Sequence, residues 1–158
     1  MEPLRFDARP FQHEGKEPFA YIMKAVAQLS PGQDFVLDNT FDPRPLESVM
    51  EARGFSFVVV TKGPEHVTIT FSPTDAAKRG DLPLVDRHTV PIDNAIFQLA
   101  GVLRRLKIGE KFSAWIGDKP SSQHLNVLKT AGAEVEVDDS WDRPGSRLVL
   151  RRVHPQQH

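Results

Sequence analysis

The chain has 158 residues, of which 39% are hydrophobic and 26% charged, a composition typical of one medium-sized globular domain or two small ones. It contains no cysteine, which excludes disulfides, thiolate metal sites and cysteine nucleophiles, and its net charge of −1 is too small to indicate general binding to polyanions. No apolar run approaches the roughly 18 residues that a membrane span needs, and we expect a soluble cytoplasmic protein.

A strand and an amphipathic helix come first in the chain. Residues 4–8 alternate between apolar and polar side chains, which predicts a strand, and residues 9–16 are typical of a polar loop. Glu17 and Pro18 indicate the start of a helix, because proline suits the first turn, where its missing N–H costs nothing. One apolar stripe along this helix is predicted from Phe19, Ile22, Met23, Val26 and Leu29.

The first half continues with a strand, a second helix and a hairpin. Residues 35–37 predict the strand, and residues 42–45 lead into a short helix that stops at Gly54. Residues 55–60 and 67–71 predict two strands joined by a turn. The order of elements in this half is therefore β-α-β-α-β-β.

The second half repeats this order after a polar, unpatterned linker at residues 74–81. Its predicted elements are a strand at residues 84–86, a helix capped by Asp93 or Asn94 and running to about residue 107, a strand at 112–116, a short helix capped by Ser121 and ended by Gly132, and a hairpin of residues 133–137 and 147–153. We therefore expect a first domain at residues 1–73, a second at 82–153 and a frayed tail at 154–158.

An internal repeat relates the two halves. The residues Phe19, Ile22, Met23, Val26, Leu29, Gly32 and Phe35 return 77 positions later as Ile96, Leu99, Ala100, Leu103, Leu106, Gly109 and Phe112. Six of these seven pairs keep their chemical type closely, which indicates two copies of one small domain. The predicted fold class is α+β: tandem two-layer α/β sandwiches, each with a four-stranded mixed sheet and two helices on one face. We expect the two domains to pack on each other, because a short linker tethers them.

Several segments of the first copy resemble a known superfamily. They are Phe6-Asp7-Ala8-Arg9 at the end of the first strand, Glu17-Pro18 at the helix start, Leu29-Ser30-Pro31-Gly32-Gln33 at its end, and then Asp42-Pro43-Arg44-Pro45-Leu46 and Ala52-Arg53-Gly54-Phe55. On these segments the chain resembles the TusA/SirA-like superfamily, and within it the uncharacterised cysteine-less branch, a domain of unknown function. The resemblance covers residues 4–71 well and residues 82–153 more weakly, which implies two tandem TusA-like domains.

The resemblance implies a sulfur carrier, and the sequence contradicts that chemistry. Members of the superfamily have a Cys-Pro-x-Pro motif at the start of the first helix, where the helix N-terminus stabilises a thiolate or persulfide. The matching segment here is Gly15-Lys16-Glu17-Pro18, and the second copy has Ile92-Asp93-Asn94-Ala95. Neither segment can carry sulfur covalently.

A small-anion site is one hypothesis for the segment that replaces the cysteine motif. Basic side chains precede a helix N-terminus there, where backbone N–H groups and the helix dipole favour anions. The candidate ligand-binding residues of the first copy are Arg9, His13, Lys16, Glu17, Asp42 and Arg44, and those of the second copy are Arg87, His88 and Asp93. The alternatives are a solvated loop and, for Asp42 and Arg44, loop hydrogen bonding and helix capping.

Metal binding and catalysis have weaker support in the sequence. The six histidines show no HxxH or HExxH spacing, so we expect no metal site and no cofactor. Ser121, Ser122 and His124 offer a nucleophile and a base, but residues at a helix start normally cap the helix, and no GxSxG turn is present. We therefore expect a protein that is not an enzyme.

A basic patch raises the alternative of RNA binding. It consists of Arg104, Arg105, Lys107 and Lys111 at the end of the second long helix. The same charges also complement the negative end of the helix dipole, and no aromatic ladder interleaves them, which argues against nucleic acid as a partner. Trp141 near the tip of the last hairpin either contacts a partner or folds back onto the hairpin.

The leading functional hypothesis is therefore a non-enzymatic tandem protein that binds a small anionic ligand or a protein partner. One alternative is an accessory protein that docks on sulfur-relay enzymes without carrying sulfur. The other alternative is RNA binding through the basic patch. No membrane partner is expected.

Overall fold

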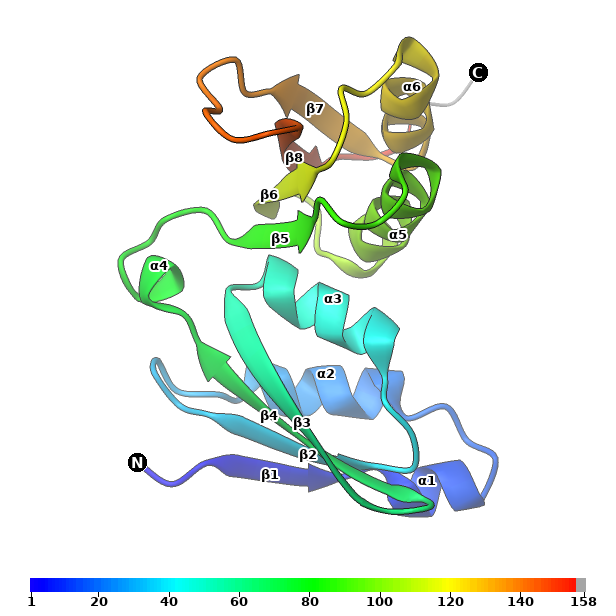
Figure 1. Ribbon diagram of the computed structural model, residues 1–158. Coiled ribbons are helices and arrows are strands. Elements are labelled where there is room, and N and C mark those ends of the chain that lie inside the picture. Colours follow the sequence, from blue (N-terminus) through cyan, green and yellow to red (C-terminus); the bar gives the residue numbers. More distant parts are fainter. Residues whose placement is uncertain (156–158) are drawn as a thin grey trace. The chain divides into compact units, whose positions relative to one another are not determined.

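The computed structural model describes residues 1–155 and consists of two compact units, each built around its own sheet (Figure 1). The first unit contains β1 (Leu4–Asp7), α1 (Arg9–His13), α2 (Phe19–Ala27), β2 (Phe35–Asn39), α3 (Arg44–Ala52), β3 (Phe55–Gly63), β4 (His66–Pro73) and α4 (Asp75–Lys78). The second contains β5 (Leu84–Arg87), α5 (Ile92–Arg105), β6 (Lys111–Ile116), α6 (Ser122–Thr130), β7 (Ala133–Val137) and β8 (Ser146–Arg152). Residues 156–158 of the predicted tail lie outside the described residues.

The first unit is a two-layer sandwich. Its sheet has the strand order β1-β2-β4-β3, in which β1 and β2 run parallel and the other neighbours run antiparallel. The helices α2 and α3 lie on one face of this sheet (Figure 1). Because side chains alternate along each strand, every second strand residue points to these helices. The resulting core includes Ile22, Leu37, Met50, Ile69 and Phe71.

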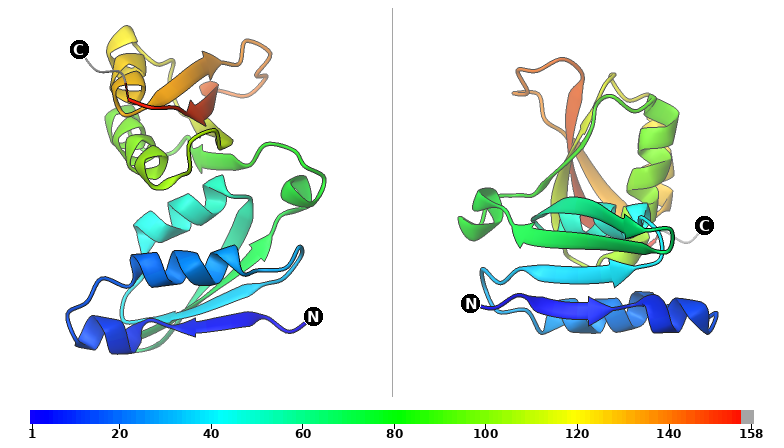
Figure 2. Two further views of the ribbon diagram at one scale, coloured as in Figure 1. Left: turned by 180° about the vertical axis from the view of Figure 1, so that it is seen from behind. Right: turned by 60° about the horizontal axis from the view of Figure 1, so that its bottom comes forward.

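The second unit repeats this plan with the strand order β5-β6-β8-β7. Here β5 and β6 run parallel, the other neighbours run antiparallel, and α5 and α6 lie on one face of the sheet (Figure 2). Its core includes Leu99, Leu103, Phe112, Ile116 and Leu148, all fully buried. The two units confirm the predicted α+β class, with two four-stranded mixed sheets and helices on one face of each.

Most predicted elements are present with small shifts at their ends. The helix α2 begins directly after Pro18, and β7 has the predicted bounds. Ser121 caps α6 as predicted and forms a capping box with His124. In this box the Ser121 Oγ accepts the N–H of His124 at 3.2 Å, and the His124 Nδ1 accepts the N–H of Ser121 at 3.0 Å.

The predicted loop at residues 9–16 is wrong in its first half, where the chain forms α1. Pro10 lies in the first turn of this helix, where a proline is tolerated. The ring of Phe11 stacks on those of Phe6 and Tyr21, with centroids 5.8 and 4.7 Å apart. This tertiary packing stabilises a helix too short to be stable through its own hydrogen bonds.

The start of α5 also differs from the prediction. The helix begins at Ile92, and Pro91 occupies the N-cap position in an extended conformation. Neither Asp93 nor Asn94 therefore caps it, because both lie inside the first turn. The fixed φ of proline sets the point at which the chain enters the helix.

The segment predicted as an unpatterned linker contains a short helix. Thr74 caps α4 by accepting the N–H of Ala77 on its hydroxyl at 3.1 Å. No helix within residues 1–155 is long and apolar enough to cross a membrane.

Candidate functional site

Arg9, a candidate for the predicted anion site, is held by Asp7. Its guanidinium donates from Nε and Nη2 to the two carboxylate oxygens at 2.9 and 2.8 Å, and its backbone N–H donates to Oδ1 at 3.0 Å. The side-chain hydrogen bond from Arg9 lowers the pKa of Asp7. The charge of Arg9 is therefore already balanced within the unit.

The other basic candidates of the first copy lie near carboxylates of their own. His13 Nε2 lies 3.7 Å from Glu65 Oε2, and Lys16 Nζ lies 3.1 Å from Glu14 Oε2. No interaction in the described part of the chain joins these two side chains to each other or to Arg9. The three basic groups are therefore not brought together around one position.

The remaining candidates of the first copy lie at helix starts. Glu17 accepts the N–H of Phe19 at 3.1 Å, at the beginning of α2. Asp42 precedes α3 and lies 3.8 Å from Nε of Arg44, whose side chain is 86% exposed. The contact of Glu17 is local to the first turn of α2. The alternative of helix capping is not observed for Asp42, because its Oδ1 is buried and has no hydrogen-bond partner among residues 1–155.

A polar cluster outside the predicted site lies at the carboxyl end of β2. We call Asp38, His66 and Thr68 the Asp38 cluster. The Asp38 Oδ1 accepts hydrogen bonds from His66 Nε2 and Thr68 Oγ1, both at 2.8 Å. Burial opposes the ionisation of Asp38, but these hydrogen bonds outweigh it, and the pKa of Asp38 is lowered.

The Asp38 cluster does not have the geometry of a hydrolytic triad. In a triad, the histidine gives one ring nitrogen to the carboxylate and the other to the nucleophile. Here Nε2 of His66 faces both Asp38 Oδ1 at 2.8 Å and Thr68 Oγ1 at 3.5 Å. The arrangement instead ties β2 to the start of β4.

The second unit has a cluster of different chemistry at the equivalent place. Asp86 corresponds to Asp7, because each lies at or next to the last residue of a parallel strand and accepts the N–H of the residue two positions later, at 3.1 and 3.0 Å. Across the parallel strand pair, Asp7 is opposite Asp38, whereas Asp86 is opposite Trp115. An indole therefore replaces the central carboxylate of the Asp38 cluster.

The indole of Trp115 belongs to a cluster of four side chains, His88, Trp115, Trp141 and Arg143, which we call the Trp115–Trp141 corner. The His88 ring stacks on Trp115, with centroids 3.7 Å apart and an interplanar angle of 10°. Trp141 meets Trp115 nearly edge-on, at 5.5 Å and 70°. The guanidinium carbon of Arg143 lies 5.2 Å from the centre of the Trp115 ring and 5.0 Å from that of Trp141. Trp141 thus folds back onto its own hairpin.

The predicted site residues of the second copy are divided between two places. Arg87 donates to the backbone carbonyl of Asp86 at 2.7 Å, and His88 Nδ1 bonds the Asp86 carboxylate. Asp93 lies in the first turn of α5 and bonds His124 Nε2 at 2.7 Å. His88 is the one candidate of this set that lies within the Trp115–Trp141 corner.

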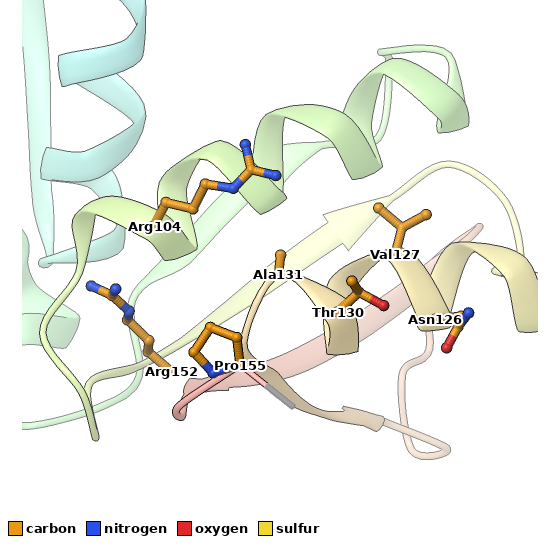
Figure 3. A pocket seen from close by; sticks show the side chains of 7 residues that line it. All are labelled: Arg104, Asn126, Val127, Thr130, Ala131, Arg152 and Pro155. Carbon is orange, nitrogen blue, oxygen red and sulfur yellow. The ribbon is translucent and has the colours of Figure 1, made fainter. Parts of the chain in front are cut away.

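A surface pocket of about 400 Å³ lies in the second unit, where α5, α6 and β8 end (Figure 3). Its lining residues are Arg104, Asn126, Val127, Thr130, Ala131, Arg152 and Pro155. Within the described part of the chain, neither the Arg104 nor the Arg152 guanidinium has an ion-pair or hydrogen-bond partner. Arg104 is the member of the predicted basic patch that lines this pocket, whereas Arg105, Lys107 and Lys111 do not line it.

Strand pairing explains why sequence spacing misses the Asp38 cluster. Asp38 and His66 are 28 positions apart and meet because β2 pairs with β4. One signal in the sequence points to this edge of both sheets: an aspartate followed two residues later by a basic residue, at Asp7 and again at Asp86. Among residues 1–155, no group of three or more histidine, aspartate or glutamate side chains is placed to hold a metal ion.

Comparison with known proteins gives a result for the first unit. No curated protein and no solved structure shows a significant match to the chain. Residues 5–73, which run from β1 to the end of β4, match the family described as "Uncharacterized conserved protein (DUF2249)". The first unit is therefore similar to that family over its whole sheet and its helices α1 to α3.

Proposed function

We propose that the protein is a non-enzymatic binding protein whose second unit holds a small oxyanion, such as a phosphate group, at Arg104 and Arg152. The observation that carries the proposal is that two guanidinium groups without a partner in the described chain line the same pocket. Arginine is suited to this role, because its planar group donates several hydrogen bonds in a fixed geometry that matches oxyanions.

The contrast with other arginines supports this assignment. Arg9, Arg79, Arg147 and Arg151 each bond a carboxylate of a nearby residue. In the pocket, the hydroxyl of Thr130 and the amide of Asn126 are the further polar groups in the lining, and both can donate hydrogen bonds. Figure 3 shows the two arginines toward one end of the pocket and Asn126 toward the other. An anion in the pocket would therefore meet positive charge at one end and neutral hydrogen-bond donors along the wall.

The family resemblance supports binding in place of covalent chemistry. The proposal includes two tandem TusA-like domains that have lost the sulfur-carrying cysteine, in a cytoplasmic protein. The chain has no cysteine, its first unit matches a family, and its second unit has the same strand order as the first. The arrangement of the Asp38 cluster, in which one histidine nitrogen faces two partners, also supports a role that is not catalytic.

Calorimetric titration with inorganic phosphate at low ionic strength tests the proposal. We expect saturable binding by the wild type that weakens as sodium chloride is added, because salt screens the attraction. Either Arg104→Gln or Arg152→Gln should weaken binding roughly tenfold or more, the effect of losing one hydrogen bond to a charged group.

Lys107→Gln is the matched control. Lys107 follows α5 and carries the same charge as Arg104, but it does not line the pocket. The variant should bind phosphate as the wild type does. Equal loss in Lys107→Gln and Arg104→Gln would show a diffuse effect of charge and would contradict a pocket site, as would the absence of phosphate binding by the wild type.

A further inference from the structure

Arg143 has unusual surroundings for an exposed arginine. It lies in the connection between β7 and β8, coloured orange in Figure 2, which also contains Asp138, Asp139 and Asp142. Within residues 1–155, its guanidinium has no ion-pair or hydrogen-bond partner. Asp138 instead binds Arg147, at 2.6 Å. The Arg143 guanidinium lies over the two indole rings of the Trp115–Trp141 corner.

The two indoles form adjacent walls around this guanidinium. Their planes stand at 70° to each other, and the Arg143 guanidinium carbon lies 5.2 and 5.0 Å from the two ring centres. A cation within about 6 Å of an indole centre is attracted by the negative face of the ring, and two such rings are a common way to bind quaternary ammonium groups.

The wall formed by Trp115 is fixed from two sides. The His88 ring stacks on the Trp115 ring, and the Nε1 of Trp115 donates a hydrogen bond to the carbonyl of Pro144 at 2.8 Å. Gly117, which follows β6, packs so closely on the carbonyl of His88 that a Cβ atom there would lie 2.4 Å from the carbonyl oxygen. The Trp115 ring is therefore held in place by its surroundings, whereas the side chain of Arg143 is exposed to solvent.

We infer that the Trp115–Trp141 corner is a binding site for an organic cation, a quaternary ammonium or guanidinium group, and that Arg143 occupies it when the ligand is absent. The acidic residues Asp139 and Asp142 in the same connection add an electrostatic attraction for a cation. The site differs in position and in ligand charge from the pocket at Arg104 and Arg152, so the two proposals stand or fall separately.

Tryptophan emission reports on this corner directly, because the chain has two tryptophans and both belong to it. The emission is measured during titration with tetramethylammonium chloride and with methylguanidinium chloride, each against equal concentrations of sodium chloride. We expect Arg143→Ala to bind both cations with a saturable change in emission, about tenfold more tightly than the wild type, because the cation that contacts both rings has been removed. Arg147, whose guanidinium carbon lies 5.9 Å from the centre of the Trp141 ring, remains in this variant and stays bonded to Asp138. Arg143→Gln should behave in the same way.

Further variants decide whether the indoles form the site. Trp141→Leu combined with Arg143→Ala should abolish the saturable change, with an unchanged far-ultraviolet circular dichroism spectrum. Arg151→Ala is the matched control. Arg151 lies on β8 and pairs with Glu134, and within residues 1–155 its guanidinium does not lie over either indole ring, so this variant should bind as the wild type does.

Two further ligands show whether the cation comes from a protein partner or from a small molecule. Tighter binding of a peptide that contains trimethyllysine than of choline would assign the cation to a protein partner, and the reverse would assign it to a small molecule. No saturable response in Arg143→Ala, or the same affinity in Arg143→Ala and the wild type, would overturn the inference.

Discussion

Asp38 shows how one side chain links the pH of the solution to the stability of the first unit. Burial opposes its ionisation, but the hydrogen bonds from His66 and Thr68 outweigh this, so the pKa of the folded state lies below the ordinary value of 3.8. A carboxylate with a lowered pKa stabilises the folded state at pH values above the unfolded-state pKa. That contribution is lost as the pH falls through the folded-state pKa.

We therefore expect Asp38→Asn to lower the free energy of unfolding at pH 7 by about 1 kcal/mol. This is less than the roughly 1.5–3 kcal/mol of a buried hydrogen bond to a charged group, because the carboxylate is partly exposed to solvent. The difference from the wild type should shrink as the pH falls below about 4. Urea unfolding followed by circular dichroism at a series of pH values measures both effects.

Asp34→Asn is the control for this experiment. Asp34 directly precedes β2, and among residues 1–155 its carboxylate has no hydrogen-bond partner. Its replacement should leave the unfolding free energy at pH 7 unchanged, because no hydrogen bond of the carboxylate is lost. A loss in Asp38→Asn that is equally large at pH 7 and at about pH 3 would refute the role given to the carboxylate charge.

Glycines show which elements of the second unit tolerate a larger side chain. Gly145 precedes β8 with φ of +88°, and a Cβ atom there would lie 2.1 Å from the carbonyl oxygen of Ile116. Gly101 lies inside α5, where an added Cβ would meet no atom within 4 Å. Glycine is required at position 145, where the positive φ and the nearby carbonyl leave no room for a side chain, and it is not required at position 101.

Replacement by alanine should therefore change stability in opposite directions at these two positions. We expect Gly145→Ala to lower the free energy of unfolding by about 3 kcal/mol, through backbone strain and the steric clash. Gly101→Ala should raise it by about 0.5–1 kcal/mol, because alanine loses less conformational entropy in a helix. Urea unfolding followed by tryptophan emission measures both variants, and a change of the same sign in both would contradict this account.

The elements were largely predictable where one periodic signal acts over several residues. The apolar stripe of α2 is visible in sequence, and Ser121 was correctly predicted to cap α6. The short helix α1 was not, because Phe11 stabilises it by stacking on rings from outside that helix. Local patterns predict local elements, and tertiary contacts add the others.

The candidate sites were less predictable for a related reason. Trp115 and Trp141 are 26 positions apart, and Arg104 and Arg152 are 48 positions apart. The two tryptophans meet through the pairing of β6 with β8, and the two arginines line one pocket at the common end of α5, α6 and β8. No short motif encodes either arrangement. The predicted basic candidates Arg9, His13 and Lys16 follow β1, but each lies within 3.7 Å of a carboxylate oxygen of its own.

At the scale of the whole molecule, the two units share a scaffold and differ at one edge of it. Both have the same strand order, and in both an aspartate near the end of the first strand accepts the backbone N–H of the residue two positions later. Beside that aspartate, the first unit has the polar Asp38 cluster, and the second has the Trp115–Trp141 corner. Two units with the same plan can differ in function, because function depends on the side chains placed on a fold and not on the fold itself.

A final prediction concerns the cooperativity of the two units. Ile69 and Leu148 occupy equivalent positions on the third strand in sheet order of their units, and both are fully buried. Replacing either by alanine should cost about 2–5 kcal/mol, because it leaves a cavity in the core. Since each unit has a core of its own, we expect each loss to affect its own unit.

Two optical signals measured on the intact chain distinguish the units. Both tryptophans lie in the second unit, so tryptophan emission follows its unfolding, whereas circular dichroism follows both units. Leu148→Ala should lower the urea midpoint measured by tryptophan emission. Ile69→Ala should leave that midpoint unchanged and lower the urea midpoint of a transition measured by circular dichroism. An equal shift of the emission midpoint in both variants would contradict independent unfolding and would support the expectation that the two domains pack on each other.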